Sequence, residues 1–484
     1  MNREIRRISL VVTAMILALL VASSVIQFAA AGQLRDDPRN SRAFYDSFDR
    51  DRGRIIAASG DVLARSEKVD DDYSYQRIYA NGELYAPVTG YVTVVGPPSG
   101  MELIENELLQ GTDDALFWTR VQDVFTGRKP TGGAVELTID PAVQQAAWDA
   151  LGETSGAAVA LDAKTGEILA LVSKPTFDPN ALAVHDPTAV LNTYQALEQD
   201  PAKPLANRAI SGDLYAPGST FKLITAAAAL ESGLYAADSE LVAPDALDLP
   251  NSSAQLTNFA DSSCAASGTM TMAEALAVSC NTAFGWLGME LGADALARQA
   301  ERFGFGRDLS IPLYVRPSTF PKGMDKAQTA MAAIGQFDDR VTPLQMAMVA
   351  AAIANGGQLM APHLVRSELD ADHRVVREVA AEELERPISR TTATALKDMM
   401  VKAAETGTGQ LARVDGLSVG AKTGTAETAP GQAPDVWTVA FGEAANRLVT
   451  VAVVVEDGGP RGQSGSGGTV AAPMAAAILA AVFR

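Results

Sequence analysis

Residues 215–230 read YAPGSTFKLITAAAAL, and this stretch decides how the rest of the sequence is interpreted. A Pro-Gly pair interrupts the chain, and the apolar run after it predicts a buried helix that Gly233 can end. Ser219 then falls in the first helical turn, with Lys222 three positions later on the same face. A serine hydroxyl is a weak nucleophile unless a base takes its proton, and a desolvated lysine can be that base. The stretch therefore predicts a catalytic Ser219 activated by Lys222.

A second short motif, Ser279-Cys280-Asn281, follows a helix that Thr271 and Glu274 begin with a capping-box pattern. Another helical run follows, so the motif is expected at a corner between two helices, where side chains can project into a cleft. Ser279 is a candidate for relaying a proton between Lys222 and a leaving group. Asn281 is a candidate for donating its amide to a substrate carbonyl and for positioning the lysine. Taken alone, the triplet is also compatible with ordinary turn chemistry.

The third motif, Lys422-Thr423-Gly424-Thr425, lies in an extended stretch near the end of the chain. Lys422 and the hydroxyls of Thr423 and Thr425 are expected to bind a substrate carboxylate, and Gly424 to let the substrate backbone lie close to the strand. The backbone N–H groups of Thr425 and Ser219 would then form an oxyanion hole. A second K-T-G tripeptide at residues 164–166 falls between two apolar strands and is interpreted as a hairpin turn.

Composition excludes several other functions. The formal net charge of −19 argues against a nucleic-acid partner, because phosphates would be repelled. The three histidines, His185, His363 and His373, lie far from one another and from carboxylates at ligand spacing. The sequence therefore predicts neither a metal site nor a Ser-His-Asp triad, and no cofactor.

The strand pattern predicts an α+β fold. Apolar strands at residues 157–161 and 167–172 form one hairpin, and those at 436–441 and 448–455 form another. Helices fill the sequence between the hairpins, and a closing helix is expected over residues 470–483. Strands from both ends of this region are expected to join in one antiparallel sheet.

The N-terminus carries a membrane segment. Arg3, Arg6 and Arg7 precede an apolar run over residues 8–31, which is long enough to cross a bilayer as a helix. The arginines are expected to stay on the cytoplasmic side, which places the rest of the chain outside the cytoplasmic membrane. A cleaved signal peptide is the alternative, with residues 29–31 as the cleavage site, but the length favours an uncleaved anchor.

Three parts are expected along the chain. Residues 1–32 form a cytoplasmic stub and transmembrane anchor, residues 33–150 a smaller non-catalytic domain, and residues 151–484 the catalytic domain. The boundary follows a strand at residues 135–139 and a helix at 141–151 that Asp140 begins. A short helix is also expected around residues 102–109.

The three motifs, in this order, are the signature shared by penicillin-binding proteins and serine β-lactamases, and the chain resembles the first of these families. Cys280 replaces the aspartate of the usual middle motif. Further stretches are similar to class B of the family, and most of all to its short actinobacterial form, penicillin-binding protein A: Arg52-Gly53-Arg54-Ile55-Ile56, Leu137-Thr138-Ile139-Asp140, Phe177-Asp178-Pro179-Asn180, Tyr215-Ala216-Pro217-Gly218, Ile334-Gly335-Gln336, Thr342-Pro343-Leu344-Gln345-Met346 and Gly407-Thr408-Gly409.

The resemblance implies a transpeptidase domain with an antiparallel sheet and helices on both faces, a pedestal or dimerisation-type domain before it, and a transmembrane helix. It also implies a peptidoglycan D,D-transpeptidase that cross-links stem peptides ending in D-Ala-D-Ala through a serine acyl-enzyme, releases D-Ala and is trapped by β-lactams. The expected partners are a glycan polymerase of the SEDS type and proteins of the divisome or elongasome. Septal wall synthesis is associated with the short actinobacterial form.

Other functions share parts of this signature. A D,D-carboxypeptidase uses the same motifs. These motifs do not determine whether water or an amine is the acceptor. A β-lactamase would need a deacylating base, and no E-x-x-L-N stretch follows Ser279 at the expected interval. A non-catalytic β-lactam-binding scaffold or sensor would have no need of Ser219, Lys222, Ser279, Asn281 and Lys422 together.

The two cysteines, Cys264 and Cys280, lie 16 positions apart in the part of the chain expected outside the membrane, where disulfides persist. A bridge between them would hold the corner that carries Ser279 and Asn281. Two free buried thiols are the alternative.

Overall fold

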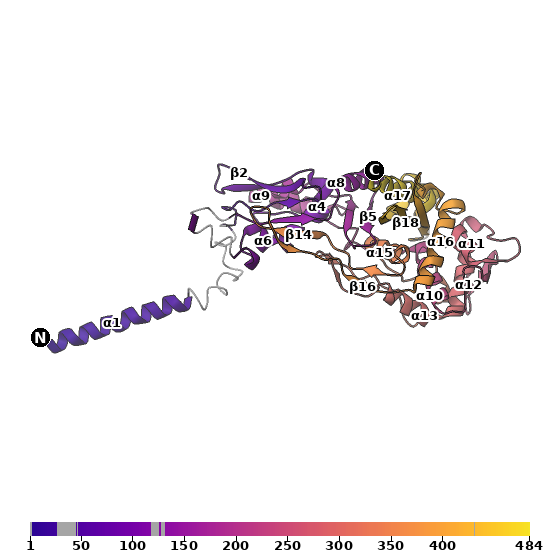
Figure 1. The fold of residues 1–484 in the computed structure, drawn as a ribbon, viewed down its shortest axis with the longest axis horizontal. Coiled ribbons are helices and arrows are strands. Elements are labelled where there is room, and N and C mark those ends of the chain that lie inside the picture. Colours follow the sequence, from indigo (N-terminus) through magenta and orange to yellow (C-terminus); the bar gives the residue numbers. More distant parts are fainter. Residues whose placement is uncertain (1, 27–44, 46, 118–124, 127–130, 430) are drawn as a thin grey trace.

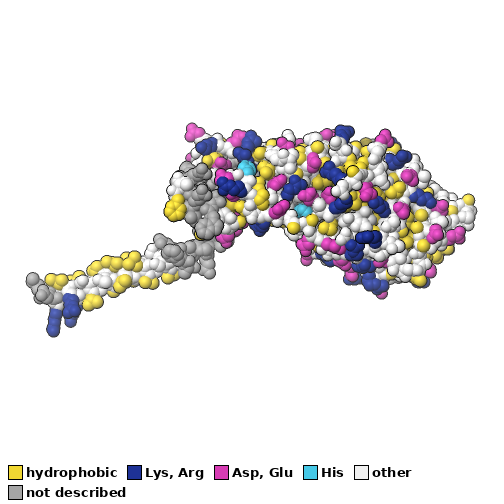
Figure 2. All heavy atoms as spheres, in the orientation of Figure 1, with side chains coloured by type: hydrophobic (Ala, Val, Ile, Leu, Met, Phe, Trp, Pro, Cys, Tyr) yellow, Lys and Arg dark blue, Asp and Glu magenta, His cyan; other side chains and the backbone are white. Residues whose placement is uncertain are grey.

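The computed structural model describes residues 2–26, 45, 47–117, 125–126, 131–429 and 431–484 (Figure 1). Helix α1 (Asn2–Ser24) projects from the N-terminal end and is followed by two mixed α/β parts that lie one after the other (Figure 1). A single apolar segment within α1 has the length and composition of a membrane-crossing helix, with a mean hydropathy of 2.1. Figure 2 shows hydrophobic side chains along this helix and basic ones at its N-terminal end. The expected end of the apolar run and the alternative cleavage site at 29–31 lie outside the described residues.

The larger, C-terminal part is built on a five-stranded antiparallel sheet in the order β17-β18-β19-β5-β6. The hairpin of β5 and β6 therefore joins the C-terminal strands in one sheet through the pairing of β5 with β19, as the sequence predicted. The predicted turn at residues 164–166 joins β5 to β6, where Lys164 Nζ contacts the backbone carbonyl of Asn446 at 2.7 Å. Strand β17 lies at one edge of the sheet. The strands have these bounds: β5 Gly156–Asp162, β6 Ile168–Lys174, β17 Ser418–Ala426, β18 Asp435–Ala444 and β19 Arg447–Val455.

Both faces of this sheet are buried, because its side chains alternate between two hydrophobic clusters. In β5, Val159 packs on the side of α15 (Pro343–Ala354), whereas Ala158 packs on the side of α8 (Pro141–Leu151) and α17 (Ala472–Val482). Asp140 caps α8 as predicted, accepting hydrogen bonds from two backbone N–H groups. The closing helix starts with a π turn over Gly467–Ala471 and continues as α17.

Helices fill the space between the two hairpins of the C-terminal part (Figure 1). They pack around α15, which consists of twelve buried residues, so the interior of this part is hydrophobic. Their bounds are α9 Pro187–Gln199, α10 Lys222–Glu231, α11 Met272–Val278, α12 Asn281–Leu291, α13 Ala293–Arg302, α14 Lys326–Ala332 and α16 Arg390–Thr406. Short strand pairs join them: β7 Glu240–Val242 with β10 Thr269–Thr271, β8 Ala246–Asp248 with β9 Gln255–Thr257, β11 Leu309–Ser310 with β12 Tyr314–Val315, and β13 Leu359–Met360 with β16 Glu383–Glu385.

The N-terminal part holds a second sheet, in the order β15-β14-β4-β1-β2-β3. Two of its strands come from residues 365–378, far beyond the expected boundary at residue 150, so the two parts share this sheet. The expected strand at 135–139 is β4, and the expected helix around 102–109 is divided in two at Glu105. The elements are β1 Ile55–Ile56, β2 Val62–Lys68, β3 Tyr75–Tyr79, β4 Ala134–Leu137, β14 Val365–Leu369, β15 Val375–Glu378, α4 Gly82–Thr89, α5 Gly100–Ile104 and α6 Asn106–Gln110.

A buried ion cluster holds this N-terminal part together. The carboxylate of Glu102, which is fully buried, lies 2.6 Å from Arg52 Nε and 2.6 Å from Arg77 Nε. Burial opposes ionisation, but the two arginines hold the pKa of Glu102 below its usual value. Removing Glu102 would leave two buried arginines unpaired, so the cluster fixes how the segment before β1 meets β3 and α5.

Candidate active site

Ser219 lies in a 3₁₀ turn, Gly218–Phe221, and Lys222 is the first residue of α10. The predicted helix is therefore correct, but the serine precedes its α-helical part. In a 3₁₀ turn the side chains at positions i and i+3 eclipse, so the two residues still share a side. Lys222 is fully buried, whereas Ser219 is partly exposed. The pair therefore combines an accessible hydroxyl with a desolvated amine.

The amine of Lys222 is held by the second motif. Its Nζ lies 2.7 Å from the backbone oxygen of Ser279 and 2.7 Å from Asn281 Oδ1. Burial lowers the pKa of Lys222 well below its ordinary value, and the nearby Lys422 lowers it further. This environment shifts Lys222 toward its neutral, basic form.

Ser279 and Asn281 lie at the predicted corner between two helices. The predicted capping box is present, with Thr271 and Glu274 bonding each other's backbone at the start of α11. Ser279 ends that helix with a φ of 62°, in the left-handed region that most residues avoid. Such strain is found where the surroundings fix a side chain for function. Here it directs both the carbonyl and the hydroxyl of Ser279 at lysines.

The third motif brings a second lysine to the same serine. Lys422 on the edge strand β17 is fully buried, and its Nζ lies 2.8 Å from Ser279 Oγ and 2.8 Å from the backbone oxygen of Thr423. Burial lowers the pKa of Lys422 to about 7. Ser279 therefore contacts both lysines, since its Oγ also lies 3.5 Å from Lys222 Nζ.

Gly424 lets the turn that carries Ser219 approach the edge strand. A Cβ at Gly424 would lie 3.0 Å from the backbone oxygen of Pro217 and 3.1 Å from Thr220 Cγ2. The missing side chain thus makes room for the turn that carries Ser219, whereas the sequence suggested room for substrate. Gly335 has the same effect on the other side, because a Cβ there would come within 1.9 Å of the Gly218 oxygen.

Residues outside the three motifs support the site, and sequence reasoning assigned them no place in it. Asn258 Oδ1 accepts hydrogen bonds from the backbone N–H groups of Asn281 and Thr282, at 2.8 and 3.1 Å. Thr408 Oγ1 lies 2.6 Å from Thr423 Oγ1. Thr408 belongs to a stretch that resembles the family, whereas no local pattern singles out Asn258.

A disulfide joins Cys264 to Cys280, in the middle of the second motif. The bridge closes a loop of 16 positions, and the chain between contains β10 and all of α11. It therefore ties the catalytic corner to the segment that precedes it.

Reduction of this disulfide is expected to lower the midpoint of thermal unfolding. In the chain-entropy model a loop of this length contributes about 3 kcal/mol. The measurement is differential scanning fluorimetry of the full chain with and without reductant. The double variant Cys264→Ser, Cys280→Ser should show the lower midpoint and ignore reductant; an unchanged midpoint in both experiments would exclude a stabilising bridge.

Comparison with known proteins shows the family to which the chain belongs. The family model described as the penicillin binding protein transpeptidase domain matches residues 156–480. The chain belongs to the class B penicillin-binding proteins. A second model, the penicillin binding protein A dimerisation domain, matches residues 52–135.

Relatives in this family match along the whole chain. The chain is 44% identical to the peptidoglycan D,D-transpeptidase PbpA of Mycolicibacterium smegmatis, over 100% of this chain and 99% of that protein. It is 43% identical to PbpA of Mycobacterium tuberculosis, again over 100% and 99%. The structure of penicillin-binding protein A from M. tuberculosis as a ceftriaxone acyl-enzyme has a TM-score of 0.88, with 41% identity, and covers 91% of this chain and all of the other. The penicillin G acyl-enzyme of the same protein has a TM-score of 0.85, with 42% identity, over 90% and 100%.

In this penicillin-binding protein family the three motifs occur in a fixed order along the chain, as they do here. The turn with Ser219, the corner with Ser279 and the edge strand with Lys422 come from three distant segments, and the fold brings them to one place. The resemblance inferred from short motifs, including the short actinobacterial form, is confirmed.

Proposed function

We propose that this protein is a peptidoglycan D,D-transpeptidase in which Ser219 forms the acyl-enzyme and which β-lactams inhibit at the same serine. The observation that carries the proposal is the meeting of three motifs at Ser279. Its backbone oxygen accepts from Lys222, and its hydroxyl lies within hydrogen-bonding distance of Lys422. One lysine on each side of a serine supports proton movement between a base and a leaving group.

In the acylation step, Ser219 Oγ attacks the carbonyl carbon of the penultimate D-Ala of a stem peptide, and neutral Lys222 takes the hydroxyl proton. The tetrahedral intermediate collapses with cleavage of the peptide bond. Terminal D-Ala leaves as an amine after receiving a proton through Ser279. An amine of a neighbouring stem then attacks the ester, which forms the cross-link and returns Ser219 to its free form.

Lys422, Thr423 and Thr425 are proposed to bind the C-terminal carboxylate of the donor stem. A cation buried at the edge of the sheet attracts this carboxylate, and the free edge of β17 allows the substrate to lie beside it as an added strand. The backbone N–H groups of Ser219 and Thr425 are proposed as the oxyanion hole. The approach of the Ser219 turn to Gly424 supports this pairing.

Acylation by penicillin is expected to slow as the pH rises above about 7. Lys422 binds carboxylate only as an ammonium ion, and its pKa of about 7 means that this charge is lost as the pH rises through that value. The second-order rate constant reports the free enzyme, so it should fall by about tenfold for each pH unit well above 7. In Lys422→Arg, whose side chain stays charged, this alkaline limb should disappear from the accessible range. A flat profile for the unaltered protein across the same range would contradict the assignment.

The proposed nucleophile is tested by mapping the β-lactam adduct. The full chain is incubated with penicillin, digested, and analysed by mass spectrometry of its peptides. The adduct is expected on Ser219, within residues 215–230. An adduct on another serine, or none, would overturn the proposal.

Each of the three parts of the chain is proposed to have its own role. Residues 1–32 anchor the protein in the cytoplasmic membrane as a single pass, with the remainder on the extracytoplasmic side. Residues 33–150 form a pedestal, whose sheet is completed by β14 and β15, and residues 151–484 carry catalysis. A SEDS-type glycan polymerase and other proteins of the divisome or elongasome are the proposed partners at the anchor and the pedestal. Apolar side chains exposed along α1 support the anchor (Figure 2).

A further inference from the structure

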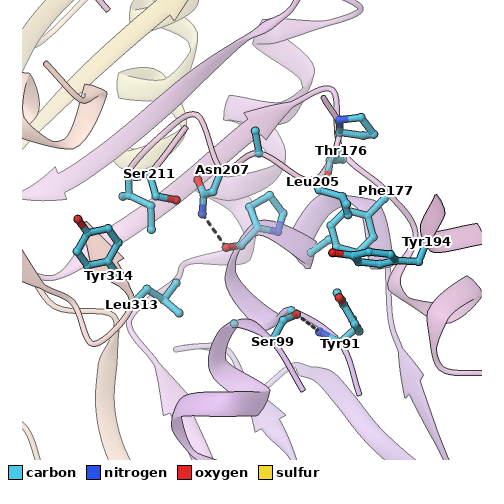
Figure 3. A pocket seen from close by; sticks show the side chains of 17 residues that line it. Tyr91, Ser99, Thr176, Phe177, Tyr194, Leu205, Asn207, Ser211, Leu313 and Tyr314 are labelled. Carbon is cyan, nitrogen blue, oxygen red and sulfur yellow. Dashed lines mark hydrogen bonds between the residues drawn. The ribbon is translucent and has the colours of Figure 1, made fainter. Parts of the chain in front are cut away.

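A pocket lies where the pedestal meets the catalytic domain, away from Ser219 and its partners. Its volume is about 370 Å³, within the range of small-molecule sites. The end of α4 and the start of α5 form its floor, and residues 176–177, Tyr194 of α9, the loop at 204–211 and residues 313–314 form its walls (Figure 3).

The walls of the pocket are aromatic and uncharged. The rings of Tyr91 and Phe177 meet edge to face at 5.9 Å, and Tyr194 lies beside them (Figure 3). None of the 17 described residues that line the pocket carries a charge. A charged ligand would be desolvated here without a partner, so the walls favour a neutral ligand with an apolar face.

Polar groups of the pocket are available to such a ligand. Thr176 Oγ1 is buried and has no hydrogen-bond partner among the described residues. A buried hydroxyl without a partner costs free energy, and a ligand hydroxyl or amide group that met it after rotation of the Thr176 side chain would remove this cost. The hydroxyl of Tyr194 points into the pocket, and the ring of Tyr314 lines the opposite side (Figure 3). Aromatic faces combined with neutral hydroxyl groups match the chemistry of a sugar ring.

The pocket lies between the membrane and the catalytic groove. In Figure 1, α4 and α9 lie on the side of the anchor, whereas α10 and α16 lie at the far end of the molecule. A glycan strand made at the membrane would therefore pass this region before its stem peptide reached Ser219.

The loop that lines the pocket also leads directly to the nucleophile. Asn207 lines the pocket, and the next residue, Arg208, places its Nε 2.9 Å from Glu456 Oε1. The hydroxyl of Tyr215 donates to the same carboxylate at 2.6 Å. The segment from the pocket to Ser219 is thus fixed at both ends, which sets a constant spacing between a ligand in the pocket and a stem in the groove.

We propose that this pocket binds an N-acetylhexosamine unit of the glycan strand whose stem peptide is being cross-linked. The inference rests on the proposed function, because only a peptidoglycan enzyme would meet such a strand. The pocket then holds the polymer while the catalytic groove holds its peptide.

The test measures binding of chitotetraose, a neutral tetrasaccharide of N-acetylglucosamine, to the full chain in detergent by isothermal titration calorimetry. We expect saturable binding at one site. Tyr194→Ala, which removes an aromatic face, should weaken it at least about fivefold. Ser211→Trp fills the pocket from its exposed rim and removes no buried contacts, and it should weaken chitotetraose binding to the same extent.

Tyr235→Ala is the matched control, because Tyr235 is also partly buried but lies outside the pocket. It should bind as the unaltered protein does. Absence of chitotetraose binding, binding that survives both pocket variants, or displacement of the sugar by a free stem pentapeptide would overturn the proposal. Acylation by penicillin should be unchanged in all three variants. Loss of Ser219 acylation in the unaltered protein would instead overturn the proposed function and leave the sugar-binding result intact.

Discussion

Ser219→Ala is expected to form no covalent adduct with penicillin and to lose transpeptidase activity by a factor on the order of 10⁶. The reason is geometric, since Ser219 is the residue whose turn packs against the edge strand and whose i+3 neighbour is the desolvated Lys222. Ser279 also lies near both lysines, but it is held in the corner as a partner of each. The measurement is the intact mass of the full chain after incubation with penicillin.

The matched control for this prediction is Ser232→Ala, at the other end of α10. Ser232 donates to the backbone oxygen of Ala229 and is remote from the three motifs, so its variant should acquire the adduct normally. Both variants should unfold at about the temperature of the unaltered protein, because a single exposed or half-buried hydroxyl contributes little to stability. A penicillin adduct that persists in Ser219→Ala would end the assignment.

Most of the site could be predicted because its elements carry local signals. The pair Ser219 and Lys222 lies within four consecutive residues. The capping box at Thr271 predicts the helix that ends at Ser279. The stretch with Lys422 leads into a hairpin, so its extended form was predicted as well. The order of three individually weak motifs then indicated one family.

What the sequence did not show depends on contacts between distant segments. Asn258, whose carbonyl oxygen holds the start of α12, belongs to a loop without any periodic pattern. The pairing of β14 with β4 joins residues more than 200 positions apart. The sequence of a single strand does not specify which other strand it pairs with. The use of Gly424 for packing against the Ser219 turn became visible only when the two segments were placed together.

The difference between the two lysines is also a product of the fold. Both are fully buried, but Lys222 donates only to neutral oxygens beside a second cation, whereas Lys422 lies on the edge strand where a carboxylate can reach it. Burial lowers both pKa values, and the charge of Lys422 adds to the effect on Lys222. When two titratable groups of one site have different pKa values, one can act in its neutral form and the other in its charged form. Lys222 is therefore expected to be the neutral base and Lys422 the cation.

Lys222→Met should consequently reduce the rate of acylation by penicillin by about 10²- to 10⁴-fold while Ser219 remains in place. Methionine keeps most of the side-chain volume but has no basic nitrogen, so the serine proton has no acceptor. Lys222→Arg should be equally slow, because a guanidinium stays protonated and cannot act as a base. Stopped-flow measurement of acylation with a chromogenic cephalosporin gives the rate constants.

Lys402→Met, on the exposed face of α16, is the matched control and should acylate at the normal rate. A structural contribution of Lys222 would lower the rate equally at every pH. Loss of the base predicts a different profile. The residual rate should depend on hydroxide and stay about level across the range in which the unaltered protein slows, because the rise in hydroxide offsets the loss of the Lys422 charge. A Lys222→Met protein that retains acylation within about tenfold would show that another group accepts the proton, since general-base catalysis by a positioned amine is worth more than that.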